Sequence, residues 1–183
     1  MDTKIRVHRA PKTLITDPGV ACCGTVDSVD ALLREAGMEV GIYDKAVPEP
    51  PMGSVHEIVD IAKKGKYDLI VGFGGGSAID AAKVVAVLAP TDDRLEDYVG
   101  VDQVPHKGLP FIAVPTTAGT GTEVAAIAIF ANEKLNVKQG VVSPHLIPNI
   151  ALVDPVLTYS ARRASPPPAA WTPSSTTSRP TSR

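Results

Sequence analysis

The sequence lacks the features that mark secreted, membrane-spanning and nucleic-acid-binding proteins. Its two cysteines, Cys22 and Cys23, are adjacent and form neither a disulfide framework nor a C-x-x-C pair, so a reducing cytoplasm is expected. No apolar run reaches the roughly 18 residues that a membrane-spanning helix needs, and residues 1–11 show no apolar signal-peptide core. The formal net charge of −2 provides no basic field for nucleic acid or an anionic membrane.

The composition changes sharply near Ser160. Beyond that point, residues 161–183 consist almost entirely of Arg, Ser, Thr, Pro and Ala around Trp171, and they show no apolar periodicity. Such a segment cannot bury enough apolar surface to fold. We therefore predict a folded domain over residues 1–160 and a disordered tail over residues 161–183.

Strand-like and helix-like segments alternate in the first part. Short apolar runs predict strands over 13–16, 39–43, 68–73, 111–115, 125–130 and 150–153. Apolar residues at helical spacing predict helices over 26–33, 54–62 and 77–88. We expect Asp17-Pro18-Gly19 to form a turn, and Ser54 and Glu57 to form a capping box. The alternation predicts an α/β fold with a doubly wound, mostly parallel, Rossmann-like sheet and helices on both faces.

A glycine-rich loop, Gly74-Gly75-Gly76, lies between a predicted buried strand and a predicted helix. Glycine lets the backbone approach a ligand closely, and the free N–H groups at a helix N-terminus favour a phosphate. Ser77 is expected to cap this helix, with Asp80 completing a capping box. A tight turn without a ligand is the alternative, because the loop matches neither G-x-G-x-x-G nor the Walker pattern.

A second loop, Pro115-Thr116-Thr117-Ala118-Gly119-Thr120-Gly121-Thr122-Glu123, also follows a predicted buried strand. Its hydroxyls and glycines suit hydrogen bonds to a polar ligand, although the loop taken alone favours a hydroxyl-rich turn that caps the next segment. Ligands on doubly wound sheets bind beyond the carboxyl ends of the strands. Two such loops therefore predict one shared crevice in which a dinucleotide lies.

The two loops resemble the nucleotide-domain signatures of the iron-containing (group III) metal-dependent alcohol dehydrogenase family. The signature G-G-G-S-x-x-D-x-x-K stands at Gly74–Lys83, and P-T-T-A-G-T-G-[ST]-E stands at Pro115–Glu123. The resemblance covers about residues 12–160. It implies an N-terminal α/β domain that binds NAD(P) and a helical C-terminal domain that binds iron or zinc. In that family, hydride passes between the nicotinamide and an alcohol or aldehyde in the cleft between the domains, and the proteins are often homo-oligomers.

The resemblance also implies which residues contact the cofactor. Asp17 would meet the adenosine ribose, where a carboxylate repels a 2′-phosphate and favours NAD over NADP. The glycine loop would hold the pyrophosphate, the threonines would line the groove, and Lys138 would face a ribose unless it is a solvated surface lysine. The full set is Asp17, Gly75, Gly76, Ser77, Asp80, Thr116, Thr117, Thr120 and Lys138. The family usually carries Asn-Pro where this chain has Glu49-Pro50.

The family pattern stops near Ser160, where the family continues to G-M-D-A-L-x-H with two of its four metal ligands. If the reading frame is shifted one base earlier, the TGG codon of Trp171 becomes ATG-G, which encodes methionine. In the same shifted frame, Thr172-Pro173-Ser174, encoded as ACG-CCC-TCx, gives Asp-Ala-Leu. We therefore expect the tail to be an out-of-frame translation, with the helical domain, all catalytic residues and all metal ligands missing. A genuine Pro/Ser/Thr-rich linker is the alternative.

Three functions follow from these observations. The first is an NAD-dependent, metal-assisted alcohol dehydrogenase whose truncated chain is inactive alone. The second is a non-catalytic NAD-binding module. The third is an enzyme similar to glycerol dehydrogenase or dehydroquinate synthase, although Pro115–Glu123 favours the alcohol dehydrogenase branch.

Overall fold

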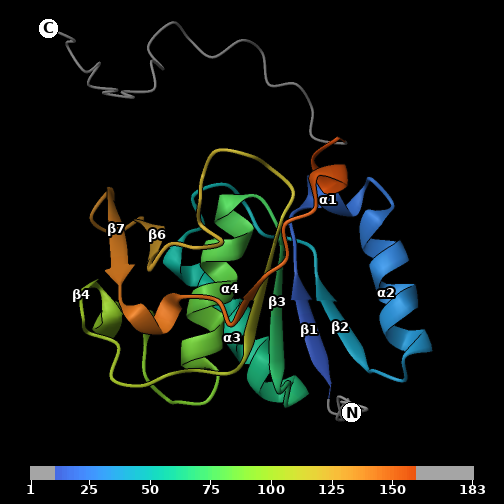
Figure 1. Ribbon diagram of the computed structural model, residues 1–183. Helices are drawn as coiled ribbons and strands as arrows, with labels where there is room; N and C mark the ends of the chain where they lie inside the picture. The colour runs from blue at the N-terminus through green and yellow to red at the C-terminus, as the bar shows by residue number, and fades with distance from the viewer. Residues whose placement is uncertain (1–10, 160–183) are drawn as a thin grey trace, which may run out of the picture.

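A computed structural model describes residues 11–159 of the chain (Figure 1). The disorder and the shifted reading frame predicted for residues 161–183 lie outside the described residues. Within residues 11–159, no helix is both long enough and apolar enough to cross a membrane.

The main sheet has five parallel strands in the order β2-β1-β3-β5-β8. These strands are β1 (Lys12–Ile15), β2 (Val40–Tyr43), β3 (Leu69–Gly74), β5 (Phe111–Pro115) and β8 (Ile150–Ala151). From β1 the chain winds outward to β2, and it then returns to form β3 on the other side of β1. The strand order thus reverses between β1 and β3, which makes their carboxyl ends the expected place for a ligand.

Helices cover both faces of this sheet, as predicted (Figure 1). Helix α2 (Thr25–Glu35) packs Val26, Val29 and Leu33 onto one face. Helices α3 (Met52–Gly65) and α4 (Gly76–Leu88) cover the opposite face and belong to the larger core. Leu32, one of the apolar residues of the helix predicted over 26–33, does not join them and is 65% exposed.

A second, smaller sheet lies beyond α4 and explains why that helix is apolar all round (Figure 1). It consists of β4 (Gly100–Val101), β6 (Ile127–Asn132) and β7 (Val137–Val142), with β6 and β7 antiparallel. The strand predicted at 125–130 therefore belongs to a hairpin and not to the parallel sheet. Strand β7 was not predicted, because Lys138, Gln139 and Gly140 interrupt its apolar residues and leave no alternating pattern.

Two local predictions are wrong for identifiable reasons. The segment after β1 is not a simple turn but a short helix, α1 (Pro18–Ala21), which Asp17 caps by accepting a hydrogen bond from the Val20 N–H at 3.0 Å. Helix α3 begins at Met52 with Pro51 as its N-cap, and the Ser54 hydroxyl donates to the Pro51 carbonyl at 2.8 Å. The predicted capping box is absent because the N-cap is Pro51, three residues before Ser54. Three short 3-10 helices complete the described chain: η1 (Leu95–Tyr98), η2 (Pro144–Leu146) and η3 (Pro155–Thr158).

Candidate functional site

A cavity of about 500 Å³ lies at the carboxyl ends of the parallel strands. Segments that follow four different strands form its walls: the ends of β1, β2, β3 and β5. The lining residues are Asp17, Pro18, Gly19, Ala46, Val47, Pro48, Gly75, Gly76, Ser77, Ala78 and Thr117. The cavity therefore occupies the position between β1 and β3 at which doubly wound sheets bind their ligands.

The glycine loop and the threonine loop meet at this cavity, as the sequence predicted. A Cβ atom added to Gly75 would lie 3.5 Å from the Thr117 hydroxyl oxygen. A Cβ atom added to Gly76 would lie only 3.1 Å from Cγ2 of Thr120, so a side chain there would crowd the Thr120 side chain. Gly75 is the N-cap of α4 and supplies no side-chain cap. The N–H groups of the first turn therefore remain available to a ligand.

Asp17 lines the cavity directly after β1, and the buried Thr16 precedes it in the chain. One Asp17 oxygen caps α1, and the other lies so close to Gly74 that an added Cβ would be 2.9 Å away. Thr16 is fully buried, and its hydroxyl is the one buried side-chain polar atom within residues 11–159 that has no hydrogen-bond partner. The cavity combines glycines that leave room, free helix N–H groups and a carboxylate. These groups fit a dinucleotide.

Ser77 and Asp80 do not form the predicted capping box. The Ser77 hydroxyl lines the cavity and accepts a hydrogen bond from the Glu49 N–H at 3.2 Å. Asp80 does not line the cavity, and its two oxygens accept hydrogen bonds from the Thr122 hydroxyl and from the Ile129 N–H. Because Gly75 is the N-cap, Ser77 lies two residues past the capping position, and Asp80 faces β6 instead.

Lys83 has a structural role that the sequence did not predict. It is 1% exposed, and its Nζ donates to the Thr122 hydroxyl (3.0 Å), the Ala125 carbonyl (2.8 Å) and the Ile127 carbonyl (2.7 Å). Burial lowers the pKa of Lys83, and the nearby Asp80 carboxylate, 3.8 Å away, opposes that shift. Burial likewise raises the pKa of Asp80, against its hydrogen bonds. The signal in the sequence was a lysine within an otherwise apolar helix, three residues after an aspartate.

The two remaining predicted contacts lie outside the cavity wall. Thr116 is 5% exposed, and its N–H donates to the Gly74 carbonyl at 3.0 Å, so it fixes the threonine loop to the end of β3. Lys138 lies on β7, and its Nζ is 2.5 Å from a carboxylate oxygen of Glu49. The structure thus brings Asp17, Gly75, Gly76, Ser77 and Thr117 together at one cavity and Thr120 beside it.

The described residues do not provide a metal centre. Within residues 11–159, no three His, Cys, Asp or Glu side chains are gathered in an arrangement that fits a metal ion. The iron or zinc that the family resemblance implies therefore has no ligand set within residues 11–159.

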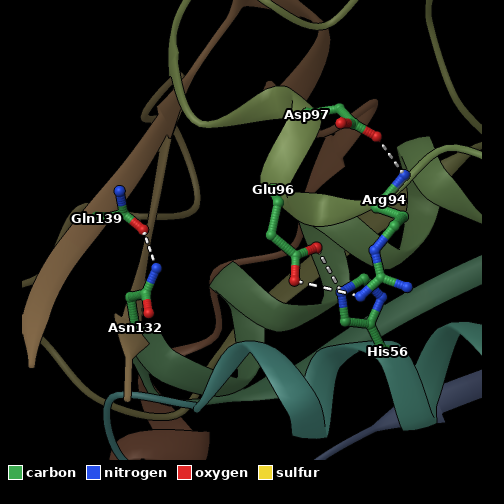
Figure 2. Close-up of polar contacts among 6 residues, drawn as sticks. All are labelled: His56, Arg94, Glu96, Asp97, Asn132 and Gln139. Carbon is green, nitrogen blue, oxygen red and sulfur yellow. Dashed lines mark hydrogen bonds and ion pairs between the residues drawn. The ribbon is translucent and has the colours of Figure 1, made fainter. Parts of the chain in front are cut away.

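A second polar cluster surrounds a cavity of about 230 Å³ beside α3, η1 and the β6–β7 turn. Figure 2 shows its contacts: His56 Nε2 lies 2.9 Å from one Glu96 oxygen, and Arg94 Nη2 lies 3.3 Å from the other. The Arg94 N–H donates to Asp97 at 3.0 Å. Partial burial favours the neutral form of Glu96, but its hydrogen bonds, including those from His56 and Arg94, outweigh this effect and lower its pKa to about 2.

The lowered pKa of Glu96 predicts a loss of stability in acid. A carboxylate whose folded-state pKa is depressed contributes stability above its unfolded pKa near 4.5, and this contribution disappears as the pH falls toward about 2. Glu96→Gln is therefore expected to be destabilising at pH 7 by less than about 1 kcal/mol, because the side chain is 40% exposed and screened. Urea unfolding at pH 7, 5 and 3 should show that the difference in free energy of unfolding between the variant and the unmodified chain shrinks as the pH falls. A difference that stays constant would contradict this assignment.

The parallel sheet with helices on both faces and a cavity at the strand reversal define a Rossmann-like α/β domain. The family model for iron-containing alcohol dehydrogenase matches residues 4–155. The chain therefore belongs to the iron-containing alcohol dehydrogenase family.

Individual relatives agree with this assignment. The chain is 44% identical over 150 residues to long-chain-alcohol dehydrogenase 1 of Geobacillus thermodenitrificans. The matched region covers 80% of this chain and 38% of that protein. It is 38% identical over 156 residues to the NAD-dependent methanol dehydrogenase of Bacillus methanolicus, covering 85% of this chain and 41% of the relative. The chain thus spans about two fifths of the length of these relatives.

Solved structures show the same relationship. A 1,3-propanediol oxidoreductase superposes with a TM-score of 0.76 at 35% identity, over 80% of this chain and 38% of that one. The sulfoacetaldehyde reductase of Bifidobacterium kashiwanohense, solved in complex with NAD+, superposes with a TM-score of 0.75 at 35% identity, over 82% and 40% of the two chains. In both comparisons, the matched part of the solved chain is well under half of it.

Proposed function

We propose that this chain binds NAD(H) in the 500 Å³ cavity and supplies the nucleotide-binding half of an alcohol dehydrogenase. The observation that carries the proposal is the convergence of the glycine loop, the threonine loop and the uncapped N-terminus of α4 at the strand reversal. The family, and relatives described as NAD-dependent or solved with NAD+, support the same cofactor. When bound, the nicotinamide would accept hydride from an alcohol or return it to an aldehyde.

Each part of the site has a defined role in this proposal. The first-turn N–H groups of α4 would bind the pyrophosphate, and the absence of side chains at Gly75 and Gly76 leaves room for it. The Asp17 carboxylate would accept hydrogen bonds from the adenosine ribose. Thr117 would hydrogen-bond a polar group of the nucleotide from the opposite wall. These residues bind and orient the cofactor, which is the contribution of this domain to the reaction.

The direct test is a fluorescence titration of the 183-residue chain with NADH. We expect saturable binding with a dissociation constant on the order of micromolar, which corresponds to about −8 kcal/mol. ADP-ribose, which lacks the nicotinamide, should compete with NADH for the same cavity. No saturable binding at millimolar NADH would contradict the proposal.

Asp17 is expected to select NAD over NADP. Asp17→Asn removes the charge that repels a 2′-phosphate, while asparagine still caps α1. The variant should bind NADPH about 10-fold more tightly and NADH no better, which corresponds to about 1.4 kcal/mol. Asp27→Asn is the matched control, because it removes the same charge from the exposed first turn of α2. Equal NADPH affinities in the two variants would show that Asp17 does not face the 2′ position.

A further inference from the structure

Thr16, the residue that follows β1, carries a polar group that the fold does not use. It is 0% exposed, and its hydroxyl has no hydrogen-bond partner within residues 11–159. Its backbone, by contrast, is fully paired: the N–H donates to the Tyr43 carbonyl at 2.8 Å, and the carbonyl accepts from the Ala46 N–H at 3.0 Å. A buried hydroxyl without a partner costs free energy, because it has given up its hydrogen bonds to water. The hydroxyl therefore does not contribute to the stability of the fold.

A complementary group lies on the next residue, Asp17. Its Oδ1 accepts a hydrogen bond from the Val20 N–H at 3.0 Å, whereas its Oδ2 receives none from the part of the chain that the structure describes. A Cβ atom added to Gly74 would lie 2.9 Å from this Oδ2 and 4.0 Å from the Thr16 hydroxyl oxygen. Both oxygens thus approach the same space. An ionised carboxylate only accepts hydrogen bonds and a hydroxyl can donate one, so each side chain can supply what the other lacks.

A bound nucleotide would make this pairing favourable. Asp17 lines the cavity, where water can solvate its carboxylate. A nucleotide displaces that water, and a carboxylate removed from water needs hydrogen-bond donors in exchange. The ribose supplies donors from within the cavity. The Thr16 hydroxyl is the donor that the protein can supply from behind the cavity wall.

We infer that Thr16 is a positioning residue whose hydroxyl donates to Asp17 when a nucleotide binds and holds the carboxylate toward the ribose 2′-hydroxyl. This inference rests on the proposed function, to which it adds the residue that orients Asp17. The ligand class it favours is an adenine nucleotide with a free 2′-hydroxyl.

Thr16→Val, which replaces the hydroxyl by a methyl group, is the main test. The variant should resist urea as well as the unmodified chain or better, because an unpaired buried hydroxyl has been removed. It should nevertheless bind ADP about 3- to 10-fold more weakly, because the Asp17 carboxylate loses its donor. ADP binding is measured by displacement of NADH, followed by fluorescence. A purely structural role for Thr16 would not raise stability and lower affinity together.

A second probe, 2′-deoxy-ADP, shows whether the effect passes through Asp17. It lacks the hydroxyl that donates to the carboxylate, so Thr16→Val should leave its affinity unchanged. Thr16→Ser keeps the hydroxyl and should bind ADP as the unmodified chain does. Thr13→Val is the matched control, because it makes the same substitution at another buried threonine, on β1, and should alter neither affinity.

Three results would overturn the inference. Thr16→Val could bind ADP as tightly as the unmodified chain, or it could lose affinity for ADP and 2′-deoxy-ADP equally, which would mean that Thr16 shapes the cavity as a whole. It could also be less stable or fail to fold, which would mean that the hydroxyl stabilises the fold. Absence of NADH binding by the unmodified chain would instead contradict the proposed function, so the two failures are distinguishable.

Discussion

Replacing Lys83 by methionine is expected to lower the free energy of unfolding by about 3–5 kcal/mol. The substitution removes three hydrogen bonds, to Thr122, Ala125 and Ile127, and it leaves the nearby Asp80 carboxylate without its counter-ion. A buried charge that has lost its partner is costly, even where the intact pair adds little net stability. The measurement is urea unfolding at pH 7, followed by circular dichroism.

Two further variants separate the loss of the pair from the loss of a lysine. Lys64→Met changes an exposed lysine on α3 and should alter stability by no more than about 0.5 kcal/mol. Adding Asp80→Asn to Lys83→Met removes the stranded charge and should recover part of the loss, which the double-mutant cycle measures as a coupling energy. If Lys83→Met lowered the free energy of unfolding as little as Lys64→Met, the buried contacts of Lys83 and Asp80 would not hold α4 to the second sheet.

Gly76→Val is expected to abolish most NADH binding, weakening it about 100-fold, or about 2.7 kcal/mol. Even the first added carbon would lie 3.1 Å from Thr120 Cγ2, so a branched side chain must separate the two loops and enter the space the pyrophosphate needs. The fold should be little affected, because the site lies at the first turn of α4, at the carboxyl edge of the sheet. A fluorescence titration with NADH and a thermal unfolding curve together test both statements.

Gly53→Val is the matched control for this prediction. Gly53 also lies in the first turn of a helix, α3, but an added Cβ would meet no atom within 4 Å. Its variant should therefore bind NADH as the unmodified chain does. Unaltered binding by Gly76→Val would show that the nucleotide does not pass between the glycine loop and the threonine loop.

The sequence predicted the parallel sheet and its covering helices well, because both depend on local patterns. Strand β3 is a continuous apolar run and α4 follows it directly, so each could be recognised from a window of about ten residues. The position of the glycine loop followed from the same pattern. Since parallel strands carry their loops at one edge, the meeting of Gly76 and Thr120 was also predictable.

Helix starts were less predictable, because several residues compete to cap a helix. At α4, Gly75 takes the N-cap position and Ser77 turns to Glu49, 28 residues earlier. At α3, Pro51 fixes the start before Ser54 is reached. In both cases, a serine at the correct spacing for a capping box forms its hydrogen bond with a different group, which the spacing does not indicate.

What the sequence by itself determined is the succession of the five parallel strands and of helices α2, α3 and α4, and the edge at which the cavity lies. Only the tertiary structure decided the partners of Asp80, Lys83, Glu49 and Lys138. Asp80 and Lys83 bond to groups between 39 and 49 residues away, and Glu49 and Lys138 are 89 residues apart. Hydrophobic periodicity involves neighbouring residues, so it can be recognised in the sequence. The partner of a charged side chain depends on which distant segments the completed fold places beside it.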